Sequence, residues 1–256
     1  PLSVELFKWV YKHVKADVQL ASIAGGTDIV SCFVLGCPNL PVHAGEIQAK
    51  GLGMDVHAYD EQEDSVVGKK GELVCTTPFP SMPIRFWNDK DGEKYRKAYF
   101  DKIPGVWIHG DFIEITPGGG VIIYGRSDTT LNPGGVRIGT AEIYRPVEKL
   151  PEILDSIVIG KKAGNDIKII LFVVLKEELK LDDNLRERIK AIIRQDATPR
   201  HVPKEIYQVS EIPRTINGKK VEKAVTQIFH GEKVVNTSVL LNSDALTDFE
   251  KLVPEL

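Results

Sequence analysis

Cysteine is scarce in this sequence. The three cysteines, Cys32, Cys37 and Cys75, leave an odd count, and none stands in a C-x-x-C pair. Disulfide frameworks and structural zinc sites are built from paired or clustered cysteines. The sequence therefore supports neither, and we expect a protein of the reducing cytoplasm.

Long apolar runs and a dominant charge are also missing. The longest apolar run, residues 167–175, is broken by Lys168 and is too short for a bilayer, which takes about 20 residues. The N-terminus has no basic stretch followed by an apolar core, so it predicts no signal peptide. With 33 basic and 36 acidic residues the net charge is −3. Because no overall positive field results, we expect no nucleic-acid and no membrane partner, and local groups must bind any anionic substrate.

The chain has ample material for globular cores, since 42% of its 256 residues are hydrophobic. Ser3 can cap a helix over residues 4–15, followed by a strand at 18–23, a turn at 25–28 and an apolar run at 29–35. The pattern is then β-rich as far as residue 126. Its last two segments flank a P-G-G-G turn and predict a hairpin.

Beyond residue 126 the pattern changes to a small α+β domain of an ordinary size. The tail after residue 236 is either loosely attached or ends in a short helix at 244–252. The elements expected before it are helices at 140–150, 184–196 and 220–230 and strands at 155–162, 167–176 and 205–210.

Three segments carry a family resemblance in their order and spacing. They are GVWIHGDFIEIT from residue 105, YGRSDTTLNPGGVRIGTAEIY from residue 124 and IPRTINGKK from residue 212. Together they resemble the final motifs of the adenylate-forming superfamily of acyl-CoA synthetases, adenylation domains and luciferases, over essentially the whole chain. Within it, GGTDIVS, FWNDKDGEKYRKAYF and the H-G-D form of the aspartate motif are similar to the acetoacetyl-CoA synthetases rather than the acetyl-CoA synthetases.

The resemblance implies an α/β and α+β fold in two parts. Residues 1–127 would be the β-rich C-terminal part of a large N-terminal adenylate-forming domain. Residues 128–256 would be a small mobile α+β domain, with its hinge at Asp128. The Ser/Thr/Gly-rich phosphate loop of the family does not occur, and the chain starts at Pro1 without a methionine. We therefore expect a fragment that is itself inactive and whose partner is the N-terminal remainder of the same protein.

The implied reaction is an acid–thiol ligation. Acetoacetate and ATP, with Mg²⁺, would give an acyl adenylate and pyrophosphate, and coenzyme A would then give acetoacetyl-CoA and AMP. Two alternatives stay open, a ligase for another short or branched acid and a non-catalytic nucleotide-binding remnant.

Asp111 and Arg126 are the first nucleotide-binding candidates. A carboxylate can accept hydrogen bonds from both ribose hydroxyls, and a guanidinium suits ribose and phosphate oxygens. The resemblance gives both residues this role. Their alternatives are a turn aspartate and a surface salt bridge. His109, beside this motif, is interpreted as structural or pocket-lining.

Thr27 and Asp28 are candidates for the phosphate and the metal. The resemblance implies that the Thr27 hydroxyl meets the α-phosphate and that Asp28 offers an oxygen to Mg²⁺, although most relatives have Glu there. Without the resemblance both would be turn or cap residues. The preceding residues Ser22, Ile23 and Ala24 are implied to contact the nucleotide.

Lys219 is the principal catalytic candidate. Its ammonium, on a long stem in a glycine-containing loop, can reach an attacking carboxylate and the α-phosphate. The motif places the lysine directly after Gly218, which selects Lys219 over Lys220, and we expect Lys220 to be solvated. Solvation alone is the alternative for Lys219 too.

Two glycines and an arginine complete the predicted site. The resemblance implies that Gly135 lets the backbone lie close to the pantetheine arm of coenzyme A. Arg137 is a phosphate-side contact or, alternatively, a structural salt bridge. Gly25 stands where acetyl-CoA synthetases have a tryptophan, which predicts a roomier acyl pocket. The aromatic residues at 86, 87, 95, 99 and 100 are expected to pack in a core.

Overall fold

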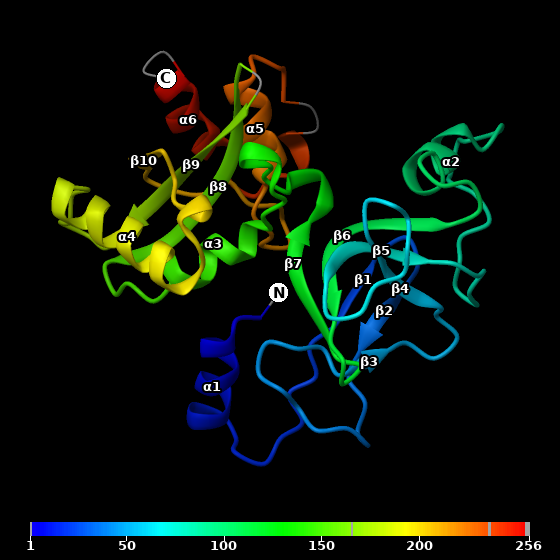
Figure 1. The fold of residues 1–256 in the computed structure, drawn as a ribbon. Coiled ribbons are helices and arrows are strands. Elements are labelled where there is room, and N and C mark those ends of the chain that lie inside the picture. Colours follow the sequence, from blue (N-terminus) through cyan, green and yellow to red (C-terminus); the bar gives the residue numbers. More distant parts are fainter. Residues whose placement is uncertain (1, 165, 235–236, 254–256) are drawn as a thin grey trace. The chain divides into compact units, whose positions relative to one another are not determined.

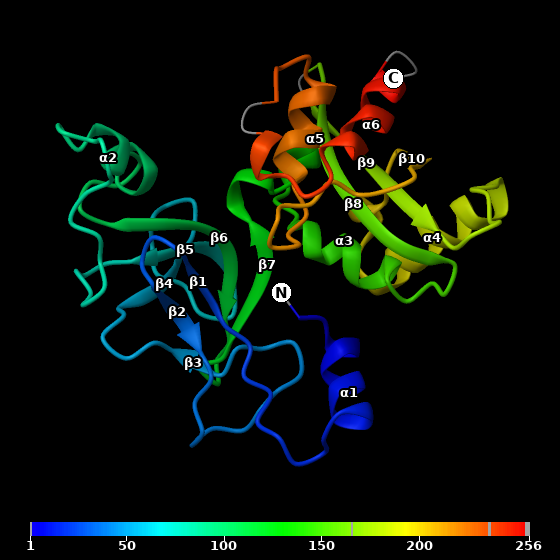
Figure 2. The ribbon, with the colours of Figure 1, turned by 180° about the vertical axis from the view of Figure 1, so that it is seen from behind.

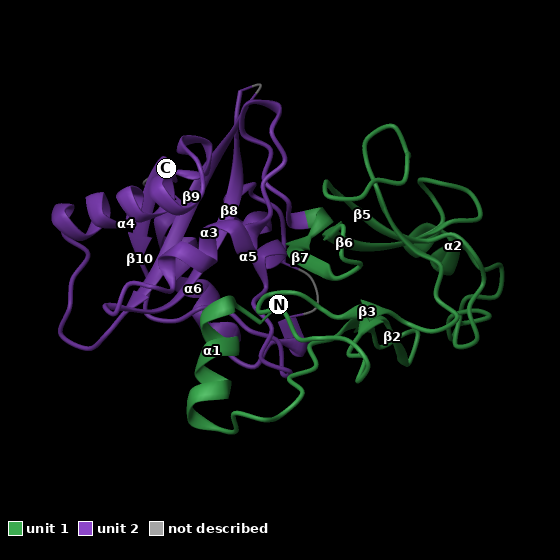
Figure 3. Cartoon of the chain, turned by 60° about the horizontal axis from the view of Figure 1, so that its bottom comes forward, with its two compact units in different colours: residues 1–128 green, residues 129–256 purple. Residues whose placement is uncertain are grey.

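The computed structural model describes residues 2–164, 166–234 and 237–253. They form two compact units, residues 1–128 and residues 129–256 (Figure 3). The short helix η1, Ser127–Thr129, spans the boundary. That Asp128 acts as a hinge stays a prediction.

The first unit is built on antiparallel strands. Its four-stranded sheet has the order β4-β5-β6-β7, and a three-stranded sheet has the order β1-β2-β3. One core cluster, which includes Phe33, Leu73 and Trp107, lies between these elements. The strands are β1 Ala24–Gly26, β2 Ser31–Leu35, β3 Ala49–Lys50, β4 Val56–Tyr59, β5 Lys70–Cys75, β6 Trp107–Ile115 and β7 Val121–Arg126; the helices are α1 Val4–His13 and α2 Glu93–Tyr99.

The sequence predictions for this unit are partly confirmed. Ser3 caps α1 by accepting a hydrogen bond from the Leu6 amide at 3.3 Å, and β6 and β7 form the expected hairpin. The strand predicted at 18–23 is wrong, because β1 begins only at Ala24 and the turn lies at residues 27–30. The apolar pattern was misleading here, since a pair of glycines forms the strand. Helix α2 was not predicted.

The second unit is a three-stranded sheet with helices on both faces (Figures 1 and 2). Its order is β10-β9-β8, with β8 and β9 antiparallel and β9 and β10 parallel. The elements are α3 Thr140–Val147, β8 Ile153–Ala163, β9 Asp166–Leu175, α4 Asp183–Asp196, β10 Glu205–Gln208, α5 Glu222–Phe229 and α6 Leu246–Leu252, with short helices η2 Pro133–Gly135, η3 Pro199–His201, η4 Thr237–Val239 and η5 Ser243–Ala245.

Side-chain alternation along the strands divides the interior of this unit into two clusters. Leu171 on β9 packs in one cluster with α3 and α4. Its neighbour Phe172 packs in the other cluster with α5 and α6. The predicted helices and strands of this unit are therefore confirmed, within shifts at their ends.

The tail after residue 236 is attached over its described part. Leu246 and Phe249 of α6 are buried in the cluster that contains α5. The loosely attached interpretation is wrong for residues 237–253, and the short terminal helix is confirmed. Among the described residues, no helix combines the length and apolar character needed to span a bilayer.

Candidate functional site

Asp111 and Arg126 face each other across the β6–β7 hairpin. They are register partners, and Arg126 Nη1 donates to Asp111 Oδ1 at 3.2 Å and to the His109 carbonyl at 2.9 Å. Arg126 Nε lies 3.5 Å from Asp128 Oδ1. The two nucleotide-binding candidates are thus brought together, with the guanidinium about half exposed and the carboxylate mostly buried.

Gly110 makes this pairing possible. Its φ is +83°, a conformation that favours glycine, and a Cβ there would collide with the guanidinium of Arg126. The glycine of the H-G-D motif therefore has a steric reason.

His109 links β6 to β1. Its Nε2 lies 3.2 Å from the Gly25 carbonyl and 3.6 Å from Asp111 Oδ2, and its side chain is 8% exposed. A Cβ on Gly26 would lie 3.1 Å from the imidazole ring. These contacts support the structural interpretation of His109, which fixes the β1 glycines against the Asp111 carboxylate.

Gly25 is tightly packed. A Cβ at this position would collide with the backbone of Ser31 and Cys32 on β2. A bulky side chain would therefore require β2 to move, so the absence of a side chain serves strand packing here. The acyl-pocket role of Gly25 stays a prediction.

Thr27 and Asp28 lie exposed in the turn after β1. The hydroxyl of Tyr99 donates to Asp28 Oδ2, and the Tyr99 ring stacks on Trp107 with centroids 3.6 Å apart. Burial raises the pKa of Tyr99, and the hydrogen bond to Asp28 raises it further, so the phenol remains a neutral donor. The sequence analysis missed this contact, because it treated Tyr99 as core packing only.

Asp28 is a single exposed carboxylate, so it fits Mg²⁺ only as one ligand beside substrate oxygens. Among the described residues, no group of three or more His, Cys, Asp or Glu side chains could hold a metal ion. Mg²⁺ commonly uses one or two carboxylates together with substrate phosphates and water. The exposed Asp28, whose Oδ2 accepts a hydrogen bond from Tyr99, can supply one carboxylate oxygen of this kind.

The other predicted nucleotide-binding residues before the turn differ in exposure. Ser22 and Ala24 are half-buried, whereas Ile23 is exposed.

Of the aromatic residues, Tyr95, Tyr99 and Phe100 pack against the core. Trp87 is exposed, so its predicted core position is wrong.

Lys219 follows a tight turn in the second unit. The turn closes through hydrogen bonds from the Gly218 amide to the Thr215 carbonyl at 2.7 Å and from the Thr215 amide to the Lys219 carbonyl at 2.9 Å. Gly218 has a φ of +76°, which favours glycine at this position. Lys219 itself is exposed, so its ammonium is accessible on a structured turn.

Lys220 is not solvated, contrary to the sequence prediction. Its side chain is 16% exposed, and its Nζ lies 2.9 Å from Asp155 Oδ1 and 4.2 Å from the centre of the Tyr144 ring. Arg214 binds the other carboxylate oxygen of Asp155. Burial acts against the charge of Asp155, but Lys220 and Arg214 outweigh it and lower the pKa of this carboxyl below its usual value. The prediction failed because Asp155 is far away in sequence.

The loop that contains Gly135 lies in the second unit, between the bridged residues Leu131 and Ile138. Gly135 has a φ of +78°, and a Cβ there would meet open space. The Gly134 amide donates to Asp166 Oδ1 at 2.7 Å, which fixes the loop to β9. Arg137 is half-buried.

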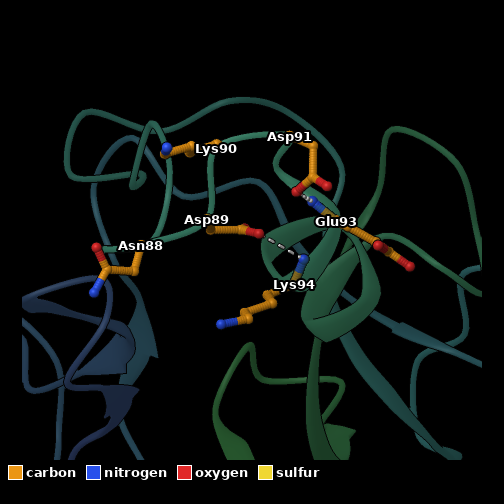
Figure 4. A pocket seen from close by; sticks show the side chains of 6 residues that line it. All are labelled: Asn88, Asp89, Lys90, Asp91, Glu93 and Lys94. Carbon is orange, nitrogen blue, oxygen red and sulfur yellow. Dashed lines mark hydrogen bonds between the residues drawn. The ribbon is translucent and has the colours of Figure 1, made fainter.

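The described residues of each unit line a cavity of about 350 Å³. In the first unit, Asp89 accepts from the amides of Lys94 and Tyr95 at 3.0 and 2.9 Å and so fixes the start of α2 beside the cavity (Figure 4). None of the predicted site residues lines that cavity. The second cavity is lined in part by Gly134, Asp166, Arg200 and Lys204.

Comparison with known proteins gives a consistent result. The AMP-binding enzyme C-terminal domain family matches residues 147–219. The chain is 56% identical over 252 residues to an acetoacetyl-coenzyme A synthetase of Rhizobium meliloti (strain 1021), which covers 98% of this chain and 39% of that protein. It is 48% identical to an acetoacetyl-CoA synthetase of Gallus gallus, covering 100% of this chain and 38% of the relative.

Solved structures agree with this likeness. An acetoacetyl-CoA synthetase from Streptomyces lividans matches with a TM-score of 0.91 and 46% identity, over 100% of this chain and 40% of that one. An ATP-bound RpMatB-BxBclM chimera, 22% identical with a TM-score of 0.76 over 90% of this chain and 44% of that one, has the same fold. The chain thus spans about two fifths of its relatives. Along its whole length the chain is similar to acetoacetyl-CoA synthetases, and residues 147–219 match the C-terminal domain of AMP-binding enzymes.

Proposed function

We propose that this chain is part of an ATP-dependent acid–thiol ligase that converts acetoacetate, ATP and coenzyme A to acetoacetyl-CoA, AMP and pyrophosphate. The observation that carries the proposal is the likeness at 46% identity and a TM-score of 0.91 to an acetoacetyl-CoA synthetase over the whole chain. The N-terminal remainder of the same protein would supply the phosphate loop. We place the reaction in the cytoplasm, as the cysteine content suggests.

In the first step an acetoacetate oxygen attacks the α-phosphorus of ATP, and the bond to the bridging oxygen breaks to release pyrophosphate. Asp111 would accept hydrogen bonds from the ribose hydroxyls, and its pairing with Arg126 at 3.2 Å keeps the carboxylate oriented. Thr27 would donate to the α-phosphate. Ser22, Ile23, Ala24 and Arg137 are the further nucleotide-binding residues that we propose.

Lys219 would stabilise the negative charge that develops as the acetoacetate carboxylate attacks the α-phosphate. Its exposure on a closed turn supports this role, because a charge must be both available and oriented. Mg²⁺, which Asp28 would hold together with the phosphates, would neutralise charge on the departing pyrophosphate.

In the second step the coenzyme A sulfur attacks the acyl carbon, the thiol proton leaves to solvent, and AMP departs. The loop around Gly135 would lie along the pantetheine arm, since nothing fills the space beside this glycine. We propose that residues 128–256 swing about Asp128 between the two steps, so that Lys219 serves the first step and this loop serves the second. Residues 1–127 would complete the N-terminal domain.

Acid profiling of the full-length protein tests the substrate. Pyrophosphate release is measured with ATP, Mg²⁺ and each of acetoacetate, acetate, butyrate and a branched acid. We expect the highest kcat/KM with acetoacetate. A preference for another acid would favour the alternative ligase, and no release with any acid would favour a nucleotide-binding remnant.

The chain of 256 residues alone serves as the matched control. We expect it to release no pyrophosphate above background, because the phosphate loop and part of the acid pocket lie outside it. Activity of the isolated chain would contradict the proposal that the remainder is required.

A further inference from the structure

The segment at residues 237–242 runs beside residues 212–216, which lead to the Lys219 turn. The Leu241 amide donates to the Arg214 carbonyl at 2.8 Å, and the Ile216 amide donates to the Val239 carbonyl at 3.1 Å. Thr215 and Leu240 form an antiparallel bridge between these bonds. The segment therefore pairs as a third antiparallel chain segment with the short hairpin in which Arg214 bridges Lys220.

Asn242 extends this pairing with its side chain. Its Oδ1 accepts from the Arg214 amide at 2.8 Å, and its Nδ2 donates to the Ile212 carbonyl at 3.0 Å. One amide thus satisfies two backbone groups on the approach to the turn. A side chain without both a donor and an acceptor could not replace it.

The segment is itself firmly anchored by α6. Phe249 is fully buried in the cluster that also contains Ile212. Asp248 Oδ2 accepts from the Ser210 amide at 3.2 Å and from the Ser210 hydroxyl. The tail therefore contacts the extended segment before the turn at several points between residues 210 and 216.

The hydrogen bonds of Gly218 and Lys219 join the turn to its flanking residues Arg214 and Thr215. Ile216, Asn217, Gly218 and Lys219 are all exposed. On the hairpin's other side Arg214 and Lys220 bind Asp155 of β8. An exposed turn takes its orientation from the strands that enter and leave it, and small displacements of a catalytic group lower rates strongly.

We propose that residues 237–242 are a positioning segment for Lys219 and that Asn242 is its central residue. The proposal rests on the catalytic role proposed for Lys219. The segment lies beyond residues 147–219, which match the AMP-binding enzyme C-terminal domain. Asn242 touches no reacting atom; it acts through the backbone at Ile212 and Arg214.

A double-mutant cycle in the full-length protein tests this proposal. Four proteins are compared: the unsubstituted protein, Asn242→Ala, Lys219→Ala and the double variant. Adenylation is followed by pyrophosphate release, and thioester formation is followed from supplied acetoacetyl adenylate. We expect Asn242→Ala to lower the adenylation kcat by about 10-fold, with the KM for ATP and the thioester step unchanged. In the Lys219→Ala background it should have no further effect.

Two further variants separate positioning from folding. Asn242→Asp keeps the acceptor for the Arg214 amide and loses only the donor to Ile212, so we expect a smaller loss. Thr247→Ala changes an exposed residue of α6 and should match the unsubstituted protein.

The outcomes distinguish this proposal from the one on which it rests. A normal adenylation rate in Asn242→Ala beside a slow Lys219→Ala would overturn the positioning segment alone. Equal losses from Asn242→Ala in both backgrounds, or in both half-reactions, would also overturn it, because they indicate a general folding role. A normal rate in Lys219→Ala would overturn the catalytic role of Lys219 and the positioning segment with it.

Discussion

The two units bury their apolar surface in different ways. In the second unit both faces of the sheet are covered, one by α3 and α4 and the other by α5 and α6. The first unit has one core cluster and leaves Val30, Leu52, Ile84 and Trp87 between 88% and 100% exposed. A sheet with both faces covered meets its own packing requirement, whereas the first unit leaves these four large apolar side chains almost fully in solvent. We therefore expect the second unit to be the self-sufficient one.

Separate expression of the units should show the largest difference. We expect residues 129–256 to fold alone and melt cooperatively, because their two clusters are complete. Residues 1–128 should aggregate, because strand edges and apolar side chains lie exposed. Calorimetry and light scattering on both pieces provide the measurement. A monomeric first unit beside an unfolded second unit would contradict the comparison.

The next prediction concerns the positive charge of Lys219. In the full-length protein, Lys219→Ala should slow adenylation by about 10²- to 10³-fold, the usual scale for one oriented electrostatic donor. Thioester formation from supplied acyl adenylate should persist, since that step forms no bond at phosphorus. Lys223→Ala, at an exposed position on α5, is the matched control and should change neither step. Equal slowing of both steps by Lys219→Ala would contradict the assignment.

A smaller effect is expected from Lys220, on stability rather than on chemistry. Lys220→Ala leaves Asp155 with one cationic partner and uncovers the Tyr144 ring. We expect a loss of about 2 kcal/mol in the free energy of unfolding of residues 129–256, below the range for fully buried pairs because the site is partly exposed. Urea unfolding measures it. Lys223→Ala should leave the midpoint unchanged, and an equal shift in both variants would show that the pair with Asp155 contributes nothing.

The smallest expected effect concerns how the stability of the second unit depends on pH. The folded pKa of Asp155 is lowered below an unfolded value of about 3.9. Its contribution is thus complete above that value and is lost as the pH falls through the folded pKa. Stability measured by urea unfolding between pH 7 and pH 3 should decline below about pH 4. The Asp155→Asn variant should be less stable at pH 7, and its free energy of unfolding should depend less on pH below pH 4. An unchanged pH dependence would show that Asp155 does not contribute to it.

Local patterns predicted the fold where the pattern and the packing coincide. The nearly continuous apolar runs of β8 and β9 are typical of strands buried on both faces, and the predicted ranges 155–162 and 167–176 differ from the observed bounds by one or two residues at each end. The β1 prediction failed because Gly25 and Gly26 form a strand for a tertiary reason, the close approach of β2 and His109. No local propensity reports such an approach.

The candidate site was likewise predicted only in part. The motif led to Asp111 and Arg126, and the hairpin register brings them together. The partners of Lys220 and of Asp28 could not be predicted, because Asp155 and Tyr99 reach them across long stretches of chain. The catalytic and binding roles themselves stay predictions.

The alternation along β9 has a consequence for how this protein can vary. The cluster on one face of the sheet contains Leu131 and Ile138, which flank the loop around Gly135. The cluster on the other face contains Ile212, at the base of the Lys219 turn. Adjacent β9 residues such as Leu171 and Phe172 therefore support different halves of the proposed chemistry. We therefore expect substitutions along this strand to affect the two proposed half-reactions separately, with a period of two residues.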